Sequence, residues 1–87
     1  MMKTLFLLMA QYDGRPIIPV DTVRADYFGH LSLDKFLRKT ASGEIKLPIV
    51  RIEASQKSER GVHVTDLAEY IDSRHAAAVK ELAQVTR

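Results

Sequence analysis

The 87-residue sequence contains no cysteine and no apolar run long enough to cross a membrane. The absence of cysteine excludes disulfide frameworks, thiolate zinc sites and cysteine nucleophiles. The apolar run Leu5–Ala10 is too short for a bilayer span. Only Lys3 precedes it, and Gln11-Tyr12-Asp13 does not resemble the cleavage site of a signal peptide. We therefore expect a cytoplasmic protein with no membrane partner.

Residues suited to catalysis or metal binding are also scarce. The three histidines, His30, His63 and His75, show no close spacing such as an i, i+4 pair. The four glycines all fall at predicted turns, so no phosphate-binding loop or nucleophile elbow is present. A chain of this size also offers little room for a catalytic cleft. We expect no catalytic residue, metal, cofactor or small-molecule substrate.

The net charge of +2 is unevenly distributed along the chain. Residues 30–61 carry seven Lys or Arg against four Asp or Glu, a net of +3, whereas residues 1–29 carry three of each. Residues 62–87 carry three basic and four acidic residues, a net of −1. A basic middle is typical of a polyanion-facing surface, and the alternative is a solvated face of mixed charge.

The first half of the sequence predicts three short helices. Residues 4–12 are continuously apolar, which fits a strand as well as a helix, but the capping Thr4 and the lack of glycine and proline favour a helix. After a turn and the apolar residues 17–20, Asp21 is expected to cap a helix over 22–28, with Gly29 as its C′ residue. Ser32 is expected to cap the next helix, over 33–41, which Ser42-Gly43 ends.

Two short helices joined by Gly29-His30-Leu31 fit a helix-turn-helix, whose second helix enters the DNA major groove. The apolar positions Leu33, Phe36 and Leu37 and residues 40–41 share one face of that helix, so its other positions point outward. Most of these outward side chains are long, polar and cationic, as contacts to base edges and phosphates require. The predicted DNA-contact residues are Ser32, Asp34, Lys35, Arg38, Lys39 and Ser42.

A β-hairpin is predicted after this helix. Residues 48–52 are predicted to form a strand that begins with proline, and residues 62–64 form the returning strand. A polar loop over 53–61 connects them. Such a loop is a wing that contacts the adjacent DNA backbone or minor groove. The predicted contacts in and around this hairpin are Lys46, Arg51, Gln56, Lys57, Ser58 and Arg60.

A final helix, capped by Thr65, is predicted from Asp66 to Gln84. It is longer than a small core needs, and its apolar positions near the end are suited to contact with a second subunit. Together with the apolar first segment, they predict a homo-oligomer, most simply a two-fold dimer. The predicted interface residues are Leu5, Leu8, Met9, Ala78, Leu82 and Val85.

The order of these elements resembles the winged-helix excisionase and MerR-like domains over residues 17–75. The counterparts are Ser32, Gly43-Glu44-Ile45, the strand 48–52 and Thr65-Asp66-Leu67. We therefore expect a single α+β, mainly helical domain over 1–87. It would comprise an N-terminal extension (1–16), a winged helix-turn-helix with a two-stranded wing (17–75) and a C-terminal helical extension (76–87).

A second resemblance spans nearly the whole chain. Residues 4–12, Ile18-Pro19-Val20, 26–29 and Lys46-Leu47-Pro48 are similar to the pyocin activator protein (PrtN) family. This resemblance implies a bacterial regulator that binds promoter DNA and activates bacteriocin or phage-tail-like gene clusters. It also implies control by DNA damage (the SOS response), which relieves a repressor of the activator.

The sequence therefore predicts a non-enzymatic transcriptional activator that binds specific double-stranded promoter DNA, with RNA polymerase and a second copy of the chain as further partners. Two alternatives remain open: an excisionase-like factor that bends DNA, and a protein-interaction module (antirepressor or oligomeric adaptor) that does not bind DNA. Salt dependence separates the last from the others, because binding through phosphates weakens steeply with added salt.

Overall fold

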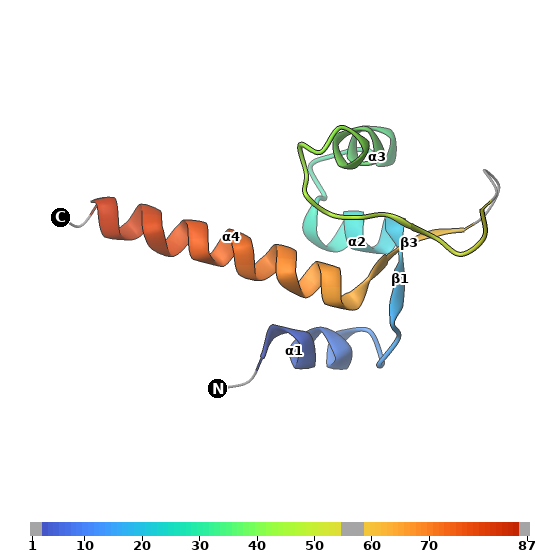
Figure 1. Cartoon of the computed structure of the whole chain (residues 1–87), viewed down its shortest axis with the longest axis horizontal. Helices are drawn as coiled ribbons and strands as arrows, with labels where there is room; N and C mark the ends of the chain where they lie inside the picture. The colour runs from blue at the N-terminus through green and yellow to red at the C-terminus, as the bar shows by residue number, and fades with distance from the viewer. Residues whose placement is uncertain (1–2, 55–58, 86–87) are drawn as a thin grey trace.

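The computed structural model describes residues 3–54 and 59–85, in which four helices pack around a three-stranded antiparallel sheet (Figure 1). The prediction of an α+β, mainly helical chain is confirmed. In chain order the elements are α1 (Thr4–Gln11), β1 (Ile17–Pro19), α2 (Val20–Tyr27), α3 (Leu33–Ala41), β2 (Val50–Arg51), β3 (Arg60–His63) and α4 (Val64–Val85).

The apolar N-terminal segment is a helix, α1, as predicted. It packs along the first half of α4 (Figure 1) and places Leu8 and Tyr12 in the core, while Phe6 and Leu7 face solvent. The Tyr12 hydroxyl donates a hydrogen bond to the Asp26 carboxylate of α2 at 2.5 Å. Burial and this hydrogen bond raise the pKa of Tyr12 above its ordinary value, so the hydroxyl stays a donor.

Helix α2 begins at Val20, two residues earlier than predicted. Its N-cap is Pro19, so Asp21 does not cap the helix but lies in the first turn, where its carboxylate pairs with Arg24 Nε at 2.6 Å. The reason is continuity with β1: the fixed φ of Pro19 leads the strand directly into a helical turn. At the other end Gly29 does not adopt the left-handed conformation expected of a C′ glycine.

Helix α3 has the bounds that the sequence predicts. The Ser32 hydroxyl accepts a hydrogen bond from the Lys35 backbone N–H at 3.2 Å, as an N-cap should. At the C-terminal end Gly43 has a φ of +81°, and its N–H donates to the Thr40 carbonyl at 3.2 Å. Left-handed backbone favours glycine, so Ser42-Gly43 ends the helix.

The sheet differs from the predicted two-stranded hairpin, because β1 joins it as a third strand in the order β1-β3-β2. Strand β2 is shorter than predicted, and β3 begins at Arg60 rather than at Val62. Gly61 lies at the centre, opposite Pro19 on β1 and Val50 on β2. A Cβ at Gly61 would lie 2.5 Å from Ile17 Cγ2 and 2.8 Å from the Ile18 carbonyl oxygen, so β1 and β3 approach this closely only because the residue is glycine.

Helix α4 follows β3 without a connecting loop and begins at Val64, earlier than predicted. Its cap also differs: the Thr65 backbone N–H donates to Nδ1 of His63 at 3.1 Å, so the imidazole serves the role predicted for the threonine. Leu67 is fully buried, but the second half of α4 projects away from the rest of the molecule (Figure 1).

The core lies where α2, α3, α4 and the sheet meet. Phe28 links these elements, since its ring centroid is 4.8 Å from that of Phe36 on α3 and 5.7 Å from that of Tyr70 on α4. Such tilted aromatic contacts stabilise the folded core beyond the contribution of burying the rings. The fully buried side chains are Ile18, Val23, Phe36, Val62 and Leu67.

Candidate nucleic-acid interface

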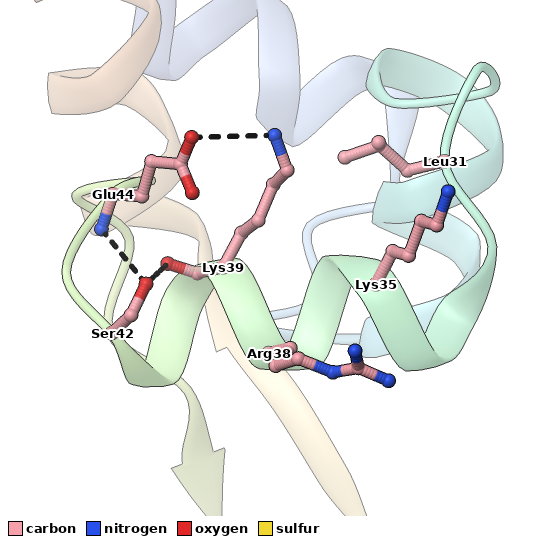
Figure 2. Close-up of a pocket in the computed structure, with 6 residues that line it drawn as sticks. All are labelled: Leu31, Lys35, Arg38, Lys39, Ser42 and Glu44. Atoms are coloured by element: carbon pink, nitrogen blue, oxygen red, sulfur yellow. Dashed lines mark hydrogen bonds and ion pairs between the residues drawn. The ribbon is translucent and has the colours of Figure 1, made fainter.

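Helix α3 has one buried and one exposed face. Lys35, Arg38, Lys39 and Ser42 are spaced i, i+3, i+4 and i+7, so they share one face, while Phe36 on the opposite face is fully buried. With Leu31 and Glu44, these four residues line an open depression of about 460 Å³ (Figure 2). The packing of Phe36 therefore fixes the orientation in which α3 presents its polar side chains.

The electrostatics of this face are positive. Lys39 Nζ lies 3.4 Å from a Glu44 carboxylate oxygen, but both groups are solvent-exposed and such a pair contributes little stability. Lys35 and Arg38 form no ion pair with any residue of 3–54 or 59–85. Figure 2 shows Arg38 extending away from the Lys39–Glu44 pair. Two cations on this face are thus uncompensated, and the third is held only weakly.

Two more cations lie beside the C-terminal half of α3. Arg51 on β2 and Arg60 on β3 are directly opposite each other in the antiparallel register, so their side chains share one face of the sheet. Both line a pocket of about 280 Å³ together with Thr40, Ala41 and Pro48, among other residues. Within the described part of the chain neither arginine has an acidic partner. Like charges directly opposite repel, and a bound anion would relieve this repulsion.

Of the twelve predicted contact residues, four line the depression on α3 and two, Arg51 and Arg60, line the second pocket. Ser32 is the cap of α3, and the side chains of Asp34 and Lys46 are exposed. Two features were not predicted from the sequence. Arg51 lies opposite Arg60 in the sheet, and Glu44 forms an ion pair with Lys39. The remaining predicted residues, Gln56, Lys57 and Ser58, lie outside the described residues.

The residues predicted to contact a second subunit fall into a buried group and an exposed group. Leu8 is only 3% exposed within the single chain, and Leu5 packs against the core, so neither presents a free apolar surface. Met9 and Ala78 are exposed, and Leu82 and Val85 are 63% and 80% exposed. Sequence reasoning missed Phe6, Leu7 and Val79, which are also exposed, because a continuous apolar run does not reveal which face is buried.

Two further features, metal-ligand clusters and membrane-spanning helices, are absent from the described part of the chain. No three of its histidine, aspartate and glutamate side chains are grouped so that they could hold a metal ion. None of its helices combines the length and the hydropathy needed to cross a membrane. His63, for example, is engaged as the cap of α4.

Comparison with known proteins identifies a protein family. No curated protein and no solved structure matches the chain. The model of the family described as pyocin activator protein PrtN matches residues 4–78. The match runs from the first residue of α1 to Ala78 in α4 and so includes α3, β2 and β3. On this match, the chain belongs to the pyocin activator protein PrtN family.

Proposed function

We propose that this protein activates transcription of pyocin-type gene clusters by binding specific double-stranded DNA in their promoters. In this proposal α2, the turn 28–32 and α3 form a helix-turn-helix, and α3 enters the major groove. Strands β2 and β3 belong to a wing that follows the neighbouring backbone. The activator acts in the cytoplasm on the nucleoid, with RNA polymerase as a further partner and DNA damage as the signal that releases it.

The observation that carries the proposal is the separation of the two faces of α3. Its inner face is anchored by Phe36, while Lys35, Arg38 and Lys39 stand on the outer face. An α-helix with its side chains is about 10–12 Å in diameter, which suits a major groove about 12 Å wide. Arginine and lysine are the side chains that most often contact guanine in that groove. A rigidly held basic helix is therefore well suited to read sequence.

The Arg51–Arg60 pair supplies the second part of the proposal. It lies beside the C-terminal half of α3, because the two arginines share a pocket with Thr40 and Ala41. A DNA phosphate placed there accepts hydrogen bonds from both guanidinium groups and offsets their mutual repulsion. Such backbone contacts set the position of α3 in the groove, although they carry no sequence information themselves.

The proposal is tested by electrophoretic mobility shift with a site selected from a random DNA pool. Replacing Lys35 and Arg38 together by alanine should weaken binding by about 1–3 kcal/mol for each lost base contact, roughly 5- to 150-fold. The matched control replaces Lys3, which precedes α1, and Lys80 on α4 by alanine. It removes the same charge from parts of the molecule away from α3. We expect it to bind nearly as wild type.

The outcomes separate the rival functions. Equal loss in both double variants would mean that net charge alone drives binding, and unchanged binding in the α3 variant would remove α3 as the reader. Binding without strong salt dependence, or no binding of DNA at all, would favour a protein-interaction module instead. DNA bending by the bound protein without activation of a reporter would favour an excisionase-like factor.

A further inference from the structure

The second half of α4 carries an apolar stripe that continues the buried face of the helix. Leu67 and Ile71 pack on the core, and Ala78, Leu82 and Val85 follow on the same face at spacings of seven, four and three residues. This is the spacing of a two-helix seam. The stripe from Ala78 onward, which we call the tail stripe, lies on the part of α4 that projects from the molecule (Figure 1).

An apolar pocket adjoins the tail stripe where α4 leaves the body. The pocket has a volume of about 300 Å³, and its lining combines α4 with α2 and the residues that follow α2. Ile71 belongs both to this pocket and to the apolar face that the tail stripe extends. Arg74 also lines it and has no acidic partner among the described residues. The lining residues are Tyr27, Phe28, His30, Tyr70, Ile71 and Arg74.

We propose that a second copy of this chain covers both features, with the two α4 helices packed antiparallel. Each Leu82 enters the pocket of the partner next to Ile71, and Ala78 lies opposite His75. Because the two copies are related by a two-fold axis, every contact occurs twice. The axis crosses α4 between residues 76 and 77. This assembly does not depend on DNA binding, and it uses none of the cations on α3.

Charge complementarity selects this partner and this orientation. Glu81 precedes Leu82 in the sequence, so a Leu82 side chain in the pocket of the partner brings Glu81 close to the partner's Arg74. In antiparallel helix pairs these two flanking positions face each other, and opposite charges there fix the choice of partner. A parallel pairing would instead set His75 against His75 and leave Arg74 beside Val79. Only the antiparallel pairing gives Arg74 an acidic partner.

Exchange of the two charges tests the proposal. Light scattering coupled to size exclusion, over a dilution series, should give a wild-type mass twice the 9.8 kDa of one chain. Arg74→Glu and Glu81→Arg should each place like charges together and raise the dimer dissociation constant roughly tenfold or more. The double variant Arg74→Glu/Glu81→Arg should restore dimerisation. Both side chains are exposed, and circular dichroism verifies that each variant is folded.

A matched apolar control uses Leu7 on α1, which is similarly exposed. Leu82→Glu should give a folded monomer, whereas Leu7→Glu should stay dimeric. A wild-type chain of monomer mass throughout the series would overturn the proposal. So would failure of the double charge exchange to restore dimers that the single changes dissociate, or dissociation by Leu7→Glu but not by Leu82→Glu.

Discussion

Replacement of Arg51 by glutamine is expected to stabilise the free protein and, at the same time, to weaken its binding to DNA. Arg51 and Arg60 face each other across β2 and β3 without an acidic partner in the described residues. Arg51 is the better site for the change, because it is exposed, whereas Arg60 is half-buried. Glutamine keeps most of the stem and removes the charge.

The size of the stabilisation follows from the register. Two unit charges about 7 Å apart in a medium like water repel by about 0.6 kcal/mol. This value lies within the range of roughly 0.2–1 kcal/mol found for cross-strand pairs. For a domain of this size it corresponds to a rise in Tm of about 2–5 °C. Binding should change in the opposite sense, since loss of one phosphate contact lowers the slope of log K against log salt by about 1.

Thermal unfolding followed by circular dichroism, without DNA, measures the first effect at low salt and in 1 M salt. The gain should disappear at high salt, because the screening length there falls to about 3 Å. The control is Arg51→Lys, which keeps the charge and should show no gain. Mobility shift over a salt series measures the second effect.

The reasoning would be refuted if Arg51→Gln lowered the Tm equally at both salt concentrations, because packing rather than repulsion would then dominate. An unchanged salt slope would show that Arg51 does not contact phosphate.

Three further predictions concern stability. Gly61→Ala should destabilise the fold by about 1–3 kcal/mol in urea unfolding, because its methyl would collide with β1, whereas Gly29→Ala, whose Cβ would meet nothing closer than 3.6 Å, should be nearly neutral. Tyr12→Phe should flatten the loss of stability above about pH 10, because the raised pKa keeps the folded hydroxyl protonated while the unfolded one ionises; an equally steep alkaline loss would contradict the role of the Asp26 contact. Ser32→Ala should cost about 1 kcal/mol through loss of the α3 cap, and Ser32→Asp should retain most of it.

Local signals in the sequence were enough to predict α3 and its positive face. Ser32, the apolar spacing through Phe36 and the Ser42-Gly43 stop all lie within or beside the helix itself. For the same reason the grouping of Lys35 with Arg38 could be predicted, since helical periodicity determines which residues share a face. Where the determining contact is local, sequence reasoning located the candidate site.

The errors arose where distant segments determine the structure. Pairing of β1 with β3 joins residues more than 40 positions apart, and a three-residue strand is too short to show alternation. That pairing starts α2 at Val20 and leaves the cap of α4 to His63. The burial of Leu8 depends on tertiary packing, and the pairing of Arg51 with Arg60 depends on strand register. Neither can be read from a continuous apolar run or from the residues of a hairpin alone.

Because α4 follows β3 directly, the number of residues at this junction determines the direction in which the side chains of α4 point. Each residue turns an α-helix by about 100°, so a single residue inserted between His63 and Val64 would point Leu67 away from the core. Helix α4 has 22 residues and is about 33 Å long, so a tilt of about 10° at the junction would move its far end by about 6 Å. Relatives of this protein should therefore vary in length between β2 and β3, but not at the junction of β3 with α4. Family members should show no insertion or deletion between His63 and Val64.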